Sequence, residues 1–259
     1  MADAGERAAL REVIEPQAPV RRRPSPDAPL DTEALKGERV RVEEVTPEGW
    51  CRGTLEADGY AGWLPENALA APGLPATHKV TVPRTLVFPG PSIKLPPSEA
   101  LSLGCRLAVV RMEELFGVTH SGGYIPVRHL APLDTFAPDM VAVAEAFLHV
   151  PYLWGGKTSL GIDCSGLVQI ALTASGIVCP RDSDMQQRAL GATLPIDDLA
   201  GLRRGDLIFW KGHVAIVRDG QSIVHANAFH MAVAVEPIGE ALRRIAEAGS
   251  PVIAIKRIA

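Results

Sequence analysis

The sequence predicts an α+β protein, in which two small β-barrels precede a domain whose helices come first and whose sheet follows. Two observations support this fold class: a weak repeat of short β segments upstream, and a change to helical and then strand patterns after Pro138. The chain has 259 residues, of which 47% are hydrophobic and 22% charged, as is typical of a folded globular protein. Its net charge of -4 gives no reason to expect nucleic acid or an anionic membrane as a partner.

Residues 1–30 are predicted to form an extended entry segment, because five prolines interrupt them. Charges at Asp3, Glu6, Arg7 and Arg11 leave no space for the apolar core of a secretory signal. The four cysteines are too scattered for a disulfide framework, and the lack of a Cys-x-x-Cys pair gives no support for a zinc site. We therefore expect a cytoplasmic protein with reduced thiols and no bound metal.

Short β segments separated by Gly- and Pro-containing turns follow in two similar copies. The GERVRV segment from Gly37 is echoed by GCRLAVV from Gly104, 67 residues later, and Tyr60 and Tyr124 are 64 residues apart after similar Gly-containing turns. Self-similarity at this spacing predicts two small barrels. We place them at residues 31–72 and 73–134, and the first can include part of the N-terminal segment.

After Pro138 the apolar residues adopt helical spacing. A first helix is expected from Met140 to the residue before Pro151, and a second, buried helix from Cys164 to Ser175, because its apolar residues lie nearly all round. A third runs from Asp182 or Ser183 to Gly191. The remaining elements are strands over 206–210, 213–217, 222–226, 233–237 and 251–258, with a helix over 238–248 before the last strand.

Cys164, His213 and His225 form the strongest chemical constellation in the sequence. Cys164 begins the second predicted helix, and a helix N-terminus and a nearby imidazole each lower the pKa of a thiol. His213 opens a strand and His225 lies 12 residues later on the next one, so antiparallel pairing can set them side by side. His225 can then hydrogen-bond one nitrogen of His213 and leave the other for the thiol, as in nucleophile, base and orienter triads. The other cysteines are expected to be inert core residues: Cys51, Cys105 and Cys179.

The segment PYLWGGKTSLGIDCSGLVQ from Pro151 resembles the signature of NlpC-type bacterial cell-wall peptidases, a papain-like cysteine peptidase family. GDLIFWKGHVAIV from Gly205 and VHAN from Val224 resemble its second and third motifs. The resemblance covers residues 138–259, and we place the boundaries of the corresponding domain at residues 135 and 259. It implies a papain-like NlpC-type catalytic domain without a cofactor, with Cys164 as nucleophile, His213 as base and His225 as third residue. The upstream barrels resemble the paired bacterial SH3-like domains of one branch.

That branch cleaves the bond between γ-D-glutamate and an L-diamino acid in murein peptides, and the chain resembles the cytoplasmic recycling enzymes that require a free N-terminal L-alanine. The implied substrate is a murein tripeptide or tetrapeptide. Tyr152 matches a tyrosine that lines the oxyanion site. The residues that match substrate contacts are Tyr60, Trp154, Asp163, Ser165, Asp182 and Ser183. The family also has a first-barrel acid for the substrate amine; Glu33 is our candidate, while Asp27 and Asp31 compete and no motif decides.

Other interpretations remain open at this point. An exported hydrolase of intact murein would show a signal peptide or lipobox, an inactive murein-binding module would lack one of the three reactive residues, and a related acyltransferase would show a rearranged motif order. Asp182 or Ser183 could serve only to cap a helix, and Tyr152 and Trp154 could be core residues. The sequence leaves open whether the diamino acid is meso-diaminopimelate or lysine, and also the oligomeric state.

Overall fold

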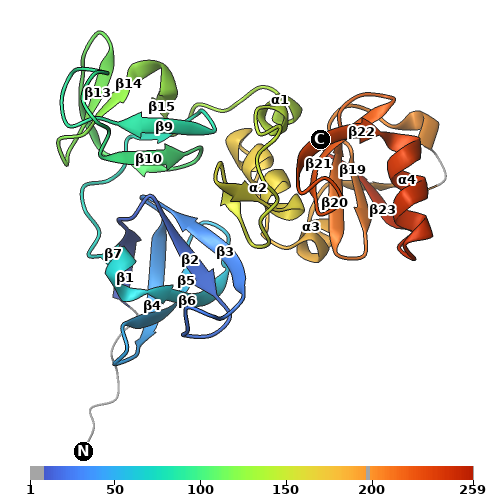
Figure 1. Cartoon of the computed structure of the whole chain (residues 1–259), viewed down its shortest axis with the longest axis horizontal. Coiled ribbons are helices and arrows are strands. Elements are labelled where there is room, and N and C mark those ends of the chain that lie inside the picture. The colour runs from blue at the N-terminus through green and yellow to red at the C-terminus, as the bar shows by residue number, and fades with distance from the viewer. Residues whose placement is uncertain (1–8, 197–198, 259) are drawn as a thin grey trace, which may run out of the picture. The chain divides into compact units, whose positions relative to one another are not determined.

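The structure is a computed structural model that describes residues 9–196 and 199–258 (Figure 1). The chain divides into two compact units, Met1–Thr135 and Phe136–Ala259. None of the helices within the described residues is long and apolar enough to span a bilayer. Each unit is described by itself below.

The first half of the first unit is a seven-stranded antiparallel sheet in the order β3-β2-β6-β5-β4-β1-β7. Alternating apolar residues of these strands close on one core, which includes Val20, Val40 and Leu64. A 3₁₀ turn, η1 (Glu66–Ala68), leads from β6 into β7. The strands are β1 (Ala9–Val13), β2 (Gln17–Arg21), β3 (Leu30–Leu35), β4 (Arg39–Val45), β5 (Trp50–Leu55), β6 (Ala61–Pro65) and β7 (Leu69–Ala70).

The first barrel includes part of the N-terminal segment, as the prediction allowed. From residue 9 onward the expected entry segment supplies two strands of the sheet, because Val13, Ala18 and Val20 are buried in its core. Pro19 fits inside β2 because only Arg21 of that strand pairs with β6, so a missing backbone N–H at position 19 breaks no ladder there. Proline content alone therefore hid two real strands.

The second half of the first unit forms three small antiparallel sheets, with the strand orders β10-β9, β11-β8-β15 and β12-β13-β14. Phe116 packs edge-on against both Phe88 and Tyr124, with ring centroids 6.2 and 6.1 Å apart. The strands are β8 (His78–Val80), β9 (Arg84–Val87), β10 (Glu99–Ser102), β11 (Arg106–Leu107), β12 (Val109–Met112), β13 (Phe116–Thr119), β14 (Tyr124–Pro126) and β15 (Leu130–Pro132).

The predicted repeat is visible at the end of each half. The β6-η1-β7 sequence of elements recurs as β14, η2 (Val127–His129) and β15; the first copy directly follows Tyr60 and the second begins at Tyr124, each after a Gly-containing turn. Gly37 lies where the halves meet: its φ is 81°, and a Cβ there would lie 2.2 Å from the Arg106 carbonyl oxygen, so only glycine fits. That residues 73–134 form an SH3-like barrel stays a prediction.

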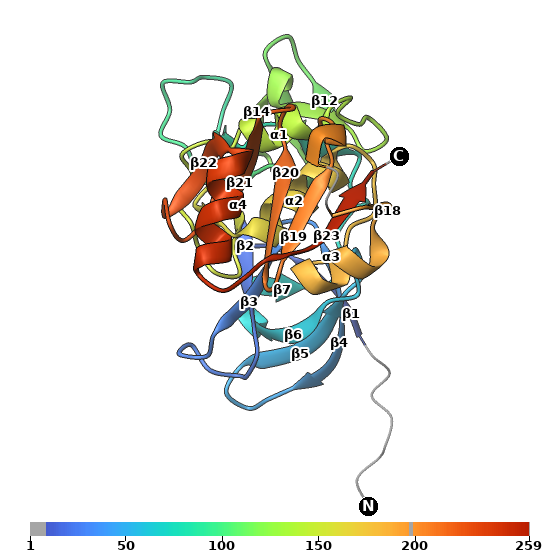
Figure 2. The same ribbon diagram turned by 90° about the vertical axis from the view of Figure 1, so that its right-hand side faces the viewer.

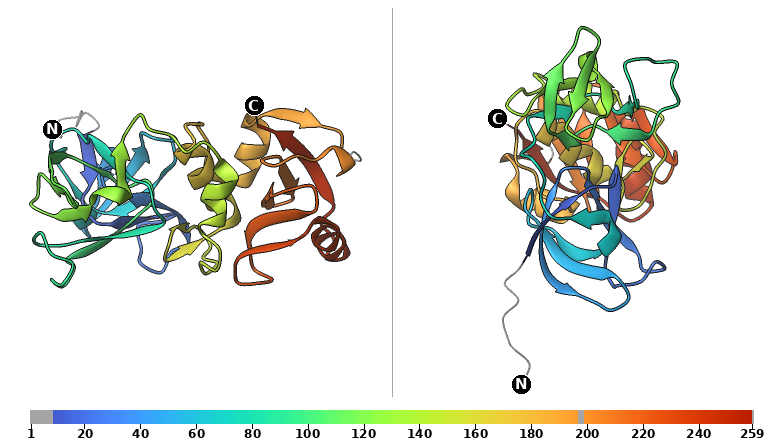
Figure 3. Two further views of the ribbon diagram at one scale, coloured as in Figure 1. Left: turned by 90° about the horizontal axis from the view of Figure 1, so that it is seen from above. Right: turned by 90° about the vertical axis from the view of Figure 1, so that its left-hand side faces the viewer.

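In the second unit, three helices precede most of the sheet strands along the chain. The sheet has six antiparallel strands in the order β18-β23-β19-β20-β21-β22 (Figure 2). The helices α2 and α4 lie on opposite sides of this sheet (Figures 1 and 3). The helices are α1 (Met140–Glu145), α2 (Cys164–Ala174), α3 (Ser183–Ala189) and α4 (Ile238–Glu247), with a 3₁₀ turn η3 (Leu199–Gly201). The strands are β16 (Lys157–Thr158), β17 (Gly161–Ile162), β18 (Ala192–Leu194), β19 (Leu207–Trp210), β20 (His213–Val217), β21 (Ser222–Asn227), β22 (Ala232–Pro237) and β23 (Val252–Arg257).

The predicted order of helices and strands in this unit is confirmed, with two differences. The helix α1 ends at Glu145 instead of continuing to Pro151, because the following residues form single turns and His149 takes a left-handed φ of 70°. The hairpin β16-β17 and the strand β18 were not predicted, since runs of two or three residues carry too little periodicity to indicate a strand.

Candidate active site

Cys164 is the first residue of α2, as its sequence context predicts. Asp163 caps this helix by accepting the Gly166 N–H at 2.7 Å. The cysteine is 7% exposed, and the backbone N–H groups of Ser165 and of Val214 in β20 lie close enough to its sulfur to favour the thiolate. The reactive sulfur is therefore held between the start of α2 and the residue that directly follows His213.

The ionisation of this thiol differs from the expectation of a lowered pKa. Burial raises the pKa of Cys164 to about 12, and the charge of Asp163 acts in the same direction, although the backbone N–H groups oppose it. Tyr152 lies close by, and its pKa is also raised, by burial and by Cys164 and Asp163. Its hydroxyl thus stays protonated and can donate a hydrogen bond, which an oxyanion-site tyrosine must do.

The two histidines form a hydrogen-bonded chain that ends in an acid. His213 Nε2 lies 2.8 Å from His225 Nδ1, and His225 Nε2 lies 2.7 Å from Glu236 Oε1. Trp210 flanks the His213 ring at 5.5 Å between centroids. Burial and the neighbouring His225 lower the pKa of His213 to about 3, so its imidazole is neutral. The expected contact between the histidines is present, whereas Glu236 was not predicted.

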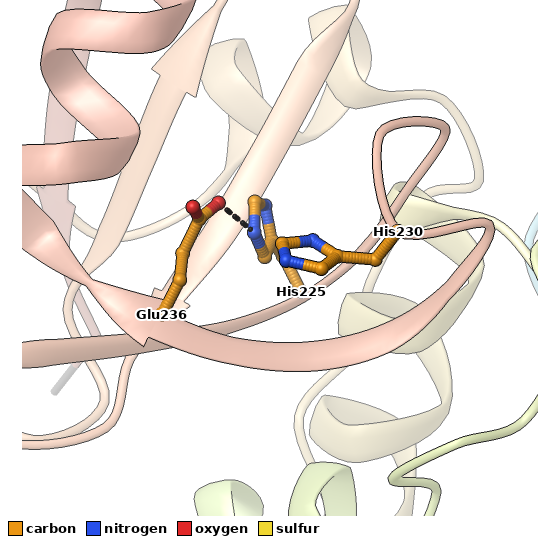
Figure 4. A group of neighbouring side chains, drawn as sticks. All are labelled: His225, His230 and Glu236. Carbon is orange, nitrogen blue, oxygen red and sulfur yellow. Dashed lines mark hydrogen bonds and ion pairs between the residues drawn. The ribbon is translucent and has the colours of Figure 1, made fainter.

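Glu236 also belongs to a group with the donor types of a metal site. Nitrogen and oxygen atoms of His225, His230 and Glu236 lie within 4.8 Å of one another (Figure 4). Both ring nitrogens of His225 already have hydrogen-bond partners, and Arg244 also pairs with Glu236. These contacts describe a hydrogen-bond chain, and we assign no metal to the group.

Asp163 and Ser165 lie in a buried polar cluster beneath Cys164. Asp163 accepts N–H groups from Gly155 at 2.8 Å and from both Nη atoms of Arg181 at 2.9 and 2.8 Å. The Ser165 hydroxyl bonds to Asp163 at 3.2 Å and accepts from Arg181 at 2.8 Å. The cluster holds the start of α2 in place. Arg181 is only 1% exposed, whereas a charged residue is usually expected on the surface, so its burial could not be predicted from the sequence. Substrate contact by Asp163 and Ser165 stays a prediction.

Three other predicted contacts lie in the second unit. Trp154 is 63% exposed, which excludes the alternative that it is a core residue. Asp182 occupies the N-cap position of α3 without a side-chain capping hydrogen bond, and both it and Ser183 are half-buried. The alternative that the Asp182 side chain serves to cap α3 is therefore not supported.

The remaining candidates lie in the first unit. Tyr60 is half-buried and packs against the core of the seven-stranded sheet, while its N–H donates to Asp58. Glu33 is 5% exposed in β3. Asp31 pairs with Arg22 at 2.7 Å and Asp27 is exposed. The roles of these residues in a substrate site stay predictions.

A buried thiol at a helix N-terminus, next to a strand that carries a histidine bonded to a second histidine, is the arrangement expected of a cysteine hydrolase. Family models agree with this class: residues 149–243 match the NlpC/P60 family, and residues 20–69 match the bacterial dipeptidyl-peptidase Sh3 domain. The second unit therefore contains an NlpC/P60 peptidase domain, and the first unit contains an SH3-like domain.

Two named relatives align in sequence with most of the chain. A gamma-D-glutamyl-L-lysine dipeptidyl-peptidase of Bacillus cereus is 27% identical over 81% of this chain and 71% of its own length. The protein of the same name from Bacillus subtilis is 28% identical over 77% of this chain and 73% of its own length. The crystal structure of an NlpC/P60 family protein from Bacillus cereus superposes with a TM-score of 0.81 at 21% identity, covering 96% of this chain and 99% of that one, and shows the same fold.

The pKa values predict that the resting thiol and imidazole are both neutral. A raised thiol pKa means that thiolate appears only as the pH rises, and a lowered pKa of His213 means that this ring takes up no proton above about pH 4. The alkylation rate of Cys164 with iodoacetamide should therefore climb about tenfold per pH unit between about pH 6 and pH 9. Peptide mapping identifies the labelled cysteine, and a rate that is level over this range would instead show a preformed thiolate–imidazolium pair.

Proposed function

We propose that this protein is a cysteine endopeptidase that cleaves the γ-D-glutamyl–L-diamino acid bond of murein peptides with a free N-terminal L-alanine. Its role would be peptidoglycan peptide recycling in the cytoplasm, and its substrate a murein tripeptide or tetrapeptide. The observation that carries the proposal is the position of Cys164 at the start of α2, close to Val214, which directly follows His213 in β20; His213 is in turn hydrogen-bonded to His225. The names of two relatives specify a γ-D-glutamyl-L-lysine bond, which supports this bond type here.

The proposed reaction is acyl transfer to the thiol. His213 Nε2 is engaged by His225, so Nδ1 is the ring nitrogen that takes the proton of Cys164 as the sulfur attacks the γ-carbonyl of D-glutamate. The Cys164 backbone N–H and the Tyr152 hydroxyl stabilise the oxyanion. The protonated His213 then gives its proton to the departing amine, and water hydrolyses the thioester to release L-Ala-γ-D-Glu. No step requires a metal or a cofactor.

Recognition of the free amine requires a carboxylate, because a desolvated ammonium group must be paired. Asp182 supports this role by its half-buried position at the start of α3, and Glu33 is the proposed first-unit partner. The α-carboxylate of the γ-linked D-glutamate requires hydroxyl donors such as those of Ser165 or Ser183. Trp154 and Tyr60 would supply apolar contact area.

We also infer that residues 73–134 are a second SH3-like barrel. The recurrence of a strand, a 3₁₀ turn and a strand after Tyr60 and again from Tyr124 supports this interpretation. Tandem barrels of this kind would limit the length of peptide that the enzyme accepts. An exported hydrolase of intact murein would need no such limit, and an inactive binding module would need no triad.

Acetylation of the substrate N-terminus tests the proposed amine requirement. It removes the ammonium charge and adds volume, so kcat/KM should fall about 30- to 1000-fold, equivalent to about 2–4 kcal/mol of transition-state binding. The measurement compares free and acetylated L-Ala-γ-D-Glu-L-Lys side by side. A tripeptide amidated at its C-terminus is the matched control, since it keeps the free amine.

The same pair of peptides, repeated with Tyr60→Ala, tests the part assigned to the first unit. We expect this variant to discriminate less between the free and acetylated peptides. Equal cleavage of both peptides by the unmutated enzyme would rule out the amine requirement and favour the exported-hydrolase interpretation.

A further inference from the structure

The geometry points to Glu236 as a positioning residue that sets the tautomers of His225 and His213 so that His213 presents a bare Nδ1. The inference rests on the proposed roles of these histidines in catalysis. It assigns a function to a buried acid that neither the sequence motifs nor the proposed chemistry uses.

The sheet register places Glu236 beside His225. On the neighbouring strands β21 and β22, His225 pairs with Ala234 and Ile223 pairs with Glu236, so the histidine and the acid share one face of the sheet. The Glu236 side chain is 8% exposed and that of His225 is fully buried. Figure 4 shows the carboxylate directed at the histidine ring, with 2.7 Å between Oε1 and Nε2.

Glu236 is held in its ionised form. Burial by itself would raise the pKa of this carboxyl, but the hydrogen bonds and charges of His225 and Arg244 outweigh burial and lower it. Arg244 reaches Glu236 from α4 and lies over the Phe229 ring at 4.3 Å from its centroid. An ionised carboxylate can only accept hydrogen bonds.

The proton positions along the chain then follow one by one. Because Glu236 only accepts, the proton between it and His225 must sit on His225 Nε2. Burial lowers the pKa of His225, so its ring is neutral and Nδ1 has a lone pair. That lone pair accepts from His213 Nε2, which must therefore carry the proton. A neutral His213 with a proton on Nε2 has none on Nδ1, the nitrogen that the proposed reaction uses as base.

Without the acid, the two histidines could bond equally well in the reverse order. His225 would then donate from Nδ1 to His213 Nε2, and a neutral His213 would carry its proton on Nδ1. In that arrangement the ring nitrogen assigned to the thiol cannot accept a proton. Glu236 selects the reactive arrangement, much as an aspartate fixes the imidazole tautomer in serine protease triads.

The test reads the tautomers directly by ¹⁵N NMR on protein labelled at its seven histidines. Spectra of His213→Ala and His225→Ala assign the two signals. Glu236→Gln is nearly isosteric, but its amide can donate as well as accept. Glu240→Gln makes the same change at an exposed position of α4 and is the matched control. Thermal unfolding of each variant reports on folding.

In the unmutated protein we expect both His213 and His225 to be protonated on Nε2 and bare on Nδ1. In Glu236→Gln, His213 should gain a population protonated on Nδ1, and kcat/KM should fall about 10- to 100-fold, mostly in kcat. Glu240→Gln should change neither. Nδ1-protonated His213 in the unmutated protein, or unchanged tautomers in Glu236→Gln, would overturn the inference. The NMR measurement needs no substrate, so a protein with the expected tautomers that cuts no murein peptide would refute the proposed function alone.

Discussion

Replacing Cys164 by alanine or serine should lower kcat/KM for murein tripeptide by about four to six orders of magnitude, since the sulfur forms the bond that defines the reaction. In the proposed reaction the acyl group is carried by this sulfur alone. Helix α2 should survive the change, because Asp163 and not Cys164 provides the capping hydrogen bond. Hydrolysis is followed by product separation, and folding by thermal unfolding.

Cys179→Ser is the matched control for this experiment. Cys179 lies in the same unit, is 3% exposed, and its thiol donates to the Pro180 carbonyl, a bond that serine can also make. We expect its kcat/KM to stay within about threefold of the unmutated value, as for a change outside the site. A comparable loss of activity in Cys179→Ser with normal folding would contradict the assignment of Cys164.

His213→Ala should cost about three to four orders of magnitude in kcat, and His225→Ala about one to three, because His213 transfers the proton whereas His225 orients it. His225→Asn should be the mildest of the three, since its amide can still bond to His213 Nε2. Steady-state kinetics at saturating substrate separate kcat from KM.

His230→Ala is the control for these variants. His230 is exposed and bonds to Asn227 beside the chain of histidines without taking part in it. Its replacement should leave kcat within about twofold. If His225→Ala and the unmutated enzyme had equal kinetics, His225 would have no place in the triad.

The fold of the second unit could be predicted well because its local signals agree with one another. Helix α2 is apolar nearly all round, which predicts its burial. Asp163 before it and Gly176 after it, with a φ of 82°, predict its two ends. Where the signals were ambiguous the prediction failed. The five prolines between residues 16 and 29 led to the prediction of an extended segment, so β1 and β2 were missed. The apolar face of α1 continued past the residue at which the helix ends.

The candidate site was predictable to the extent that its residues stand at the ends of elements. Cys164 and His213 each begin one, and the interval to His225 matches a hairpin. Glu236 was missed because an acid in a strand usually faces solvent. The register of β21 with β22 was the available signal, since it sets residue 236 on the same face as His225. For Arg181, nothing in the sequence indicated that it would be buried beside Asp163.

The most direct test of the central claim is to incubate the protein with L-Ala-γ-D-Glu-L-Lys and with the meso-diaminopimelate analogue, and to identify the products by mass. Cys164→Ala, incubated in parallel, accounts for any contaminating activity. We expect L-Ala-γ-D-Glu and the free diamino acid from at least one of the two peptides, and neither product from the variant. Release of free alanine, or an intact pair of peptides after incubation with folded protein, would contradict it.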